Sequence, residues 1–222
     1  SKIENFLEKK LAKFFNKKSA LVFSSGYHAN LAIASTLINK NTIIIQDKLN
    51  HASLVYAALL SKGKLVRYRH CDLIHLQNLL EKYKGNDLIV MTDGVFSMDG
   101  DHAPLIGITK LCQTYNALLI VDDAHGIGVL GENGAGIVEE MGLEKKIDLL
   151  IGTFGKSFGA AGAFIVGSER IIEAFIQKAR TYIYTTALLP SLAATIVHTL
   201  NMIKESNDMR LHIRELVADY KK

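Results

Sequence analysis

The 222-residue sequence is poor in several features that mark particular protein classes. Its only two cysteines, Cys71 and Cys112, lie far apart without a CxxC motif or a nearby pair of histidines. This pattern argues against a disulfide framework and a metal site, and it fits a reduced, cytosolic setting. No apolar run approaches the roughly 18 residues that a membrane-spanning helix needs, and no signal-like segment opens the sequence. With two prolines and no repeat, there is no sign of an interdomain linker.

Motifs for binding nucleotides and nucleic acids are missing as well. No G-x-x-x-x-G-K-[ST] sequence occurs, and no G-x-G-x-x-G follows the first predicted strand. Gly155-Lys156-Ser157 matches the end of a P-loop, but Leu150 stands where the first glycine of that loop is required. The net charge of +4 is modest. The one dense lysine cluster, residues 9–18, alternates with Leu and Phe at helical spacing, which is typical of a solvated helix face.

What the sequence has in abundance is short apolar runs that alternate with helical patterns. Predicted strands are residues 20–23, 42–45, 65–68, 87–92, 117–121, 148–153 and 163–166. Predicted helices are residues 3–15, 29–38, 51–60, 72–84, 104–115, 168–180, 190–205 and 208–221, with Asn50 and Asp72 as N-caps. This alternation predicts an α/β fold with a mostly parallel, seven-stranded sheet wrapped by helices.

Unusual polar residues gather where the predicted strands end. They are Ser25, Gly26, His51, Ser97, Asp122, His125, Thr153 and Lys156. Ligands of open α/β sheets bind beyond the carboxyl ends of the strands, so these residues are candidates for one site. Lys156 stands among small residues just after a buried strand. If it is partly desolvated, its pKa falls and the neutral amine becomes a nucleophile towards carbonyls. The alternative is an exposed loop lysine beside turn glycines.

Two further features suit a ligand that carries both a cation and a phosphate. Asp122 follows five apolar residues, and a buried carboxylate is costly without a cationic partner. Residues 24–28 form a strand-to-helix turn that places backbone N–H groups at a helix N-terminus, although a plain turn has the same pattern. Together with Lys156 these features suit pyridoxal phosphate (PLP) chemistry, in which lysine forms a Schiff base and Asp holds the pyridinium nitrogen. His125 with Asp122 and Asp123 is a weaker candidate for a metal site, because no third ligand lies nearby in sequence.

Five motifs carry a resemblance to a known family. They are SSGYHAN, DKLNHASL, TDGVFSMDGD-AP, IVDDAHGIGVLGENGAG and TFGKSFGAAGAF. The sequence resembles the α-oxoamine synthases, PLP enzymes of the aspartate-aminotransferase fold (fold type I). The resemblance implies that residues 1–222 form the large PLP-binding domain, with residues 190–222 as a helical connection towards a small domain. The N-terminal segment and the C-terminal small domain of the family are expected to be absent.

The resemblance also implies a role for each site residue. Lys156 would hold PLP and transfer protons, Asp122 would pair with the ring nitrogen, and His51 would stack on the ring. These three are the expected catalytic residues. The remaining expected cofactor contacts are His125 and Ser97 to the ring hydroxyl, and Gly26, Tyr27 and Thr153 to the phosphate. No metal is expected.

The implied reaction joins an amino acid to an acyl thioester with loss of CO2. The TFGKSFG motif and residues 182–187 resemble family members that use L-alanine and pimeloyl-CoA, or a pimeloyl carrier protein, in biotin biosynthesis. The alternatives are glycine with acetyl-CoA, or a truncated and inactive PLP-binding scaffold. The resemblance further implies a homodimer in which Thr185 and Thr186 reach the partner's phosphate. Neither a nucleic-acid nor a membrane partner is expected, because of the charge pattern and the lack of a long apolar run.

Overall fold

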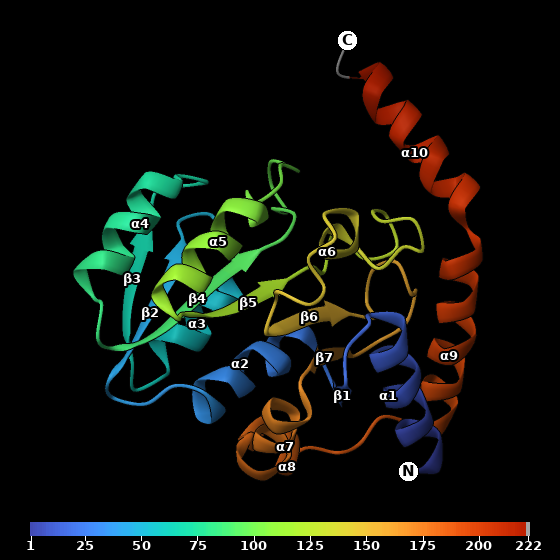
Figure 1. Ribbon diagram of the computed structural model, residues 1–222. Coiled ribbons are helices and arrows are strands. Elements are labelled where there is room, and N and C mark those ends of the chain that lie inside the picture. The colour runs from blue at the N-terminus through green and yellow to red at the C-terminus, as the bar shows by residue number, and fades with distance from the viewer. Residues whose placement is uncertain (221–222) are drawn as a thin grey trace.

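The computed structural model describes residues 1–220 and contains one sheet of seven strands (Figure 1). In sequence order the strands are β1 (Ser19–Phe23), β2 (Thr42–Asp47), β3 (Lys64–Tyr68), β4 (Asp87–Asp93), β5 (Leu118–Asp122), β6 (Leu149–Thr153) and β7 (Ala163–Gly167). Their spatial order is β1-β7-β6-β5-β4-β2-β3. The predicted seven strands of a mostly parallel sheet are therefore confirmed.

Only β7 runs against its neighbours. It pairs antiparallel with both β6 and β1, whereas the pairs among β2 to β6 are parallel. The short connection between β6 and β7 explains this direction. A short turn can join two antiparallel strands, whereas parallel strands need a longer crossover connection. Residues 154–162 make that turn, and the N–H of Phe154 donates to the carbonyl of Gly162 at 2.9 Å. Lys156 lies on this connection.

Helices cover both faces of the sheet (Figure 1). On one face pack α1 (Lys2–Phe14), α4 (Leu73–Lys82), α5 (Leu105–Tyr115), the short α6 (Ile137–Glu140) and α9 (Pro190–Glu205). On the other pack α2 (Gly26–Thr36), α3 (Ala52–Leu59) and α7 (Glu169–Lys178). Alternate residues of β2 serve the two cores, because Ile43 and Ile45 belong to one cluster and Ile44 to the other.

A few element boundaries differ from the sequence predictions. The predicted 51–60 helix starts at Ala52 and its N-cap is His51, whose Nδ1 accepts from the N–H of Ser53, so Asn50 as N-cap was wrong. Asn50 instead bonds the neighbouring strand, donating to the carbonyl of Met91 at 2.8 Å. The four-residue helices α6 and α8 (Arg180–Ile183) were not predicted.

The last helix, α10 (Asn207–Tyr220), extends away from the sheet (Figure 1). It was expected over 208–221, and residue 221 lies outside the described residues, as do the last two residues of the expected 190–222 connection. No helix in the described part of the chain has the length and apolar character to cross a membrane.

Candidate cofactor site

A cavity of about 270 Å³ opens at the carboxyl ends of β4, β5 and β6. Its lining includes seven of the eight residues predicted to touch the cofactor: Gly26, Tyr27, His51, Asp122, His125, Thr153 and Lys156. Four polar lining residues had no predicted role: Asn30, Ser53, Tyr56 and Asp93. Ser97 does not line the cavity; it is exposed in the turn after β4. The sheet thus brings together most of the predicted site.

Asp122 is the buried anionic group of the cavity. Its side chain ends β5 and the residue is only 8% exposed. One carboxylate oxygen accepts from the N–H of Ala124 at 3.1 Å, and the other accepts from Asn30 Nδ2 at 2.9 Å. No ion pair to Asp122 occurs among residues 1–220. Since a buried carboxylate is stabilised by a cation, this position fits the protonated ring nitrogen of a pyridine cofactor.

Asn30 links Asp122 to His51 through a chain of hydrogen bonds. Asn30 Nδ2 also donates to Ser53 Oγ at 2.8 Å, and Ser53 Oγ lies 2.7 Å from His51 Nδ1. The N–H of Ser53 donates to the same Nδ1 at 3.2 Å. His51 Nδ1 is therefore an acceptor, and the proton of the neutral ring resides on Nε2. No sequence pattern indicates this series of hydrogen bonds, because its residues come from three separate segments.

Asp93 is a second buried carboxylate, paired in register with Asp122 across β4 and β5. It accepts from the N–H of His51 at 2.7 Å. Burial, and then the charge of Asp122, raise the pKa of Asp93 to about 8. The sequence did contain a signal, since Asp93 ends an apolar strand in the same way as Asp122. Asp93 therefore holds a proton near neutral pH, beside the carboxyl group of Asp122.

His125 is expected to be neutral at pH 7. Burial lowers its pKa, and the nearby charge of Lys156 lowers it further. A neutral imidazole both donates and accepts a hydrogen bond, as a contact to a ring hydroxyl requires.

The N-terminus of α2 offers an anion site on the cavity wall. Ser25 caps the helix by accepting from the N–H of His28 at 3.2 Å. The N–H groups of Gly26 and Tyr27 meet no protein acceptor in the described chain. A Cβ built on Gly26 has no atom within 4 Å, so packing does not demand glycine there; a side chain would occupy the cavity instead. These free donors and the open space beside them fit a phosphate.

Thr153 and Lys156 occupy the β6–β7 connection. Thr153 Oγ1 donates to the carbonyl of Gly162 at 3.1 Å, so its hydroxyl must turn to donate to a phosphate. Lys156 is exposed, so the partial desolvation considered from the sequence is not found. Its backbone is nevertheless fixed, because the neighbouring Phe154 and Phe158 are buried and their rings pack edge to face at 5.1 Å.

The fold and this set of residues define a class of protein. Residues 1–219 match the family described as aminotransferase class I and II, and the chain belongs to this family of PLP-dependent enzymes. The donor set fits PLP, with a lysine, a buried carboxylate and a helix N-terminus around one cavity.

Comparison with individual relatives indicates a narrower group within this family. The chain is 48% identical over 217 residues to 8-amino-7-oxononanoate synthase of Hahella chejuensis, and 46% identical over 216 residues to that of Marinobacter nauticus. In both cases 97% of this chain and 55% of the relative are covered. The resemblance to the α-oxoamine synthases is thereby confirmed.

Solved structures agree with these relatives. Serine palmitoyltransferase of Sphingomonas wittichii superposes with a TM-score of 0.93 at 35% identity, covering 97% of this chain and 54% of that one. The 8-amino-7-oxononanoate synthase of Francisella tularensis gives a TM-score of 0.88 at 38% identity, covering 97% and 62%. The fold is therefore that of PLP-dependent transferases, as predicted. The chain spans little more than half the length of the curated relatives it matches.

Proposed function

We propose that this chain is the cofactor-binding part of an acyltransferase that condenses L-alanine with pimeloyl-CoA, or a pimeloyl carrier protein, to 8-amino-7-oxononanoate, CO2 and the free thiol. The observation that carries the proposal is the placement of Lys156, Asp122 and the α2 N-terminus around one cavity. The choice of substrates is supported by relatives of that name at 46–48% identity.

Each residue has a physical task in this reaction. PLP supplies the electron sink that acidifies the Cα–H of the amino acid. Lys156 Nζ would hold the cofactor through its aldehyde group, and as a free amine it would accept the Cα proton of the amino acid. Asp122 keeps the ring nitrogen protonated. His51 presents its ring to the cofactor face, in an orientation that Ser53 fixes by two hydrogen bonds to Nδ1.

The phosphate and ring hydroxyl complete the set of contacts. Gly26 and Tyr27 supply backbone N–H groups to the phosphate, and Thr153 its hydroxyl after rotation. Neutral His125 contacts the ring hydroxyl, and the exposed Ser97 does so only if the turn after β4 moves towards the cavity. Thr185 and Thr186 are exposed and lie outside the cavity, which suits a role in the partner's site of a homodimer.

Steady-state assays of the full-length protein test the substrate choice. Alanine with pimeloyl-CoA is compared with glycine plus acetyl-CoA, and with serine plus palmitoyl-CoA, since a serine palmitoyltransferase is among the structural neighbours. We expect the first pair to give the highest kcat/KM. Preference for another pair would reject the substrates and keep the reaction class. No turnover with any pair by a PLP-loaded protein would favour the inactive scaffold.

A further inference from the structure

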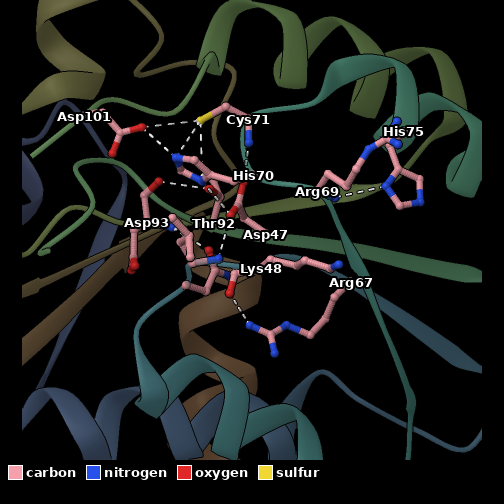
Figure 2. Close-up of polar contacts among 12 residues, drawn as sticks. Asp47, Lys48, Arg67, Arg69, His70, Cys71, His75, Thr92, Asp93 and Asp101 are labelled. Carbon is pink, nitrogen blue, oxygen red and sulfur yellow. Dashed lines mark hydrogen bonds and ion pairs between the residues drawn. The ribbon is translucent and has the colours of Figure 1, made fainter. Parts of the chain in front are cut away.

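A second cluster of reactive side chains lies outside the cofactor cavity, beside the end of β2 (Figure 2). It consists of Asp47, His70, Cys71 and Asp101. These residues come from the end of β2, the loop after β3 and the loop after β4. None lines the cavity, and the proposed reaction uses none of them. Only the folded chain brings them together, and for this reason the spacing of cysteines and histidines in the sequence predicted no metal site.

Asp47 fixes the orientation of the His70 ring. His70 Nδ1 lies 2.9 Å from Asp47 Oδ1, and Nε2 lies 2.7 Å from Asp101 Oδ2. Asp47 is fully buried and also accepts from the N–H groups of Leu49 and Cys71, each at 2.8 Å. A histidine that donates one ring N–H to an anchored carboxylate directs its other nitrogen outward, which is the arrangement found in metal-binding histidines.

The Cys71 sulfur lies over the His70 ring, close to both ring nitrogens, with Nδ1 at 3.8 Å. This Sγ lies 3.5 Å from His70 Nε2 and 3.8 Å from Asp101 Oδ2 (Figure 2). Cys71 has a φ of 54°, in the left-handed region that disfavours most side chains and tolerates asparagine better. A strained backbone thus holds a thiol against an imidazole and a carboxylate. The hydrogen bonds of His70 with Asp47 and Asp101 do not account for this thiol, because they form without it.

We propose that Cys71 Sγ, His70 Nε2 and Asp101 Oδ2 bind a divalent transition-metal ion of the zinc type, with Asp47 supporting the histidine from behind. The three atoms lie 3.5, 3.8 and 2.7 Å apart, so rotation of the side chains can bring them around one ion. Zinc is bound by S, N and O at about 2.0–2.3 Å.

The fit requires two side-chain movements. Cys71 Sγ must rotate from above the His70 ring towards the ring plane, where the lone pair of Nε2 points, and Asp101 must shift. Tetrahedral geometry needs the Nε2 to Oδ2 separation to widen by about 0.6 Å, and the Asp101 side chain is 42% exposed on a turn. The carbonyl oxygen of His102, 3.8 Å from Cys71 Sγ, or a water supplies the fourth ligand. The metal displaces the thiol proton and any proton on Nε2, and both go to solvent. A mixed S, N and O donor set favours Zn²⁺ or Co²⁺ over Mg²⁺ and Ca²⁺.

Titration with Co²⁺ tests the site directly. Full-length protein with PLP bound is freed of metal and titrated while the ligand-field bands of tetrahedral Co²⁺ are recorded at the red end of the visible spectrum, clear of the cofactor. We expect one Co²⁺ per chain and displacement by Zn²⁺. Cys71→Asn removes the thiol and suits a positive φ, so the fold is kept while affinity falls at least about 100-fold. The matched control is Cys112→Ala, a buried cysteine of α5, which should bind as the unmodified protein does.

Two results would overturn the proposal: absence of the bands in the unmodified protein, or equal Co²⁺ affinity in Cys71→Asn. Asp101→Asn is the second variant should Cys71→Asn fail to fold, and it too must weaken binding. As an independent readout, Zn²⁺ should raise Tm in the unmodified protein and in Cys112→Ala only. Neither result depends on the identity of the acyl substrate.

Discussion

Asn30 shows how much of the site depends on a residue without reactive chemistry. It is 1% exposed, and its single amide nitrogen donates to both Asp122 and Ser53. Removing the Asn30 amide deletes a hydrogen bond to the buried carboxylate of Asp122. It also deletes the hydrogen bond to Ser53, the residue that orients His51. Hydrogen bonds to charged groups contribute about 1.5–3 kcal/mol.

We therefore expect Asn30→Ala to weaken PLP binding by about 10- to 100-fold, measured by titrating the apoprotein with PLP. Asn39→Ala is the matched control, since Asn39 Nδ2 also donates to a carboxylate, Asp87, but on the exposed surface. Equal losses in the two variants would contradict the role of the buried chain.

The raised pKa of Asp93 makes the stability of the folded chain depend on pH. This pKa is raised from 3.8 to about 8 in the folded chain, so folding favours the protonated form. The stabilisation from this proton is complete below about pH 4 and is lost as pH rises through about 8. In the apoprotein, Asp93→Asn should remove this loss, so its Tm advantage over the unmodified chain should grow between pH 5 and pH 8. That range lies between the ordinary and the raised pKa of Asp93. A constant difference across that range would contradict the assignment.

At the scale of elements, the segment after β5 is organised around Asp123. This carboxylate is fully buried, its pKa is raised well above the usual range by burial, and it accepts from the N–H of Ile137 at 2.7 Å. Glycines surround it: a Cβ on Gly126 would lie 2.2 Å from one oxygen, and a Cβ on Gly136 2.0 Å from the other. Asp123 therefore has a structural role, whereas Asp122 beside it faces the cavity.

Gly126→Ala should destabilise the chain by about 1–3 kcal/mol, because Asp123 cannot move without losing its backbone donors. Gly155→Ala is the control, since its Cβ would meet nothing closer than 3.6 Å. Urea unfolding measures both free energies. If Gly126→Ala left the free energy of unfolding unchanged, the segment after β5 would be shown to rearrange freely.

The helix α10 is attached to the body mainly through Arg210, the one buried residue of that helix. Its guanidinium donates to the carbonyl of Glu132 at 2.7 Å and to that of Ile203. Arg210→Ala should raise amide hydrogen exchange throughout α10 and leave the sheet unchanged. Arg214→Ala, which removes an exposed pair with Glu140, should have a much smaller effect.

Apolar runs predicted the strands well because most strands, with the edge strand β3 as the exception, fill a core on both faces, and burial leaves a clear pattern. The helices α6 and α8 were missed because four residues are too few to show a period. Asp122 and Lys156 were found because each breaks an apolar or small-residue context. Asn30 and Ser53 were missed because a buried polar residue inside a helical pattern resembles a surface one until its partners are known.

For the molecule as a whole, the described residues gather the candidate cofactor site in a chain that spans little more than half the length of the curated relatives. Adding PLP to the chain should still give the absorbance band of lysine-bound cofactor near ~420 nm, and Lys156→Ala should abolish it. Lys178→Ala, at an exposed lysine of α7, is the control. Persistence of the band in Lys156→Ala would show that another amine holds the cofactor.

The reversal of β7 has a consequence for the order of folding. The turn that carries Lys156 closes between adjacent strands, so its contacts are local. The hydrogen bond between Asn30 and Asp122 joins residues 92 positions apart, and β1 reaches β7 only after most of the chain has been placed. Distant contacts form more slowly than local ones because they cost more chain entropy. During refolding, the lysine should therefore be in place before the carboxylate network, and tight capture of PLP should appear only in the last kinetic phase.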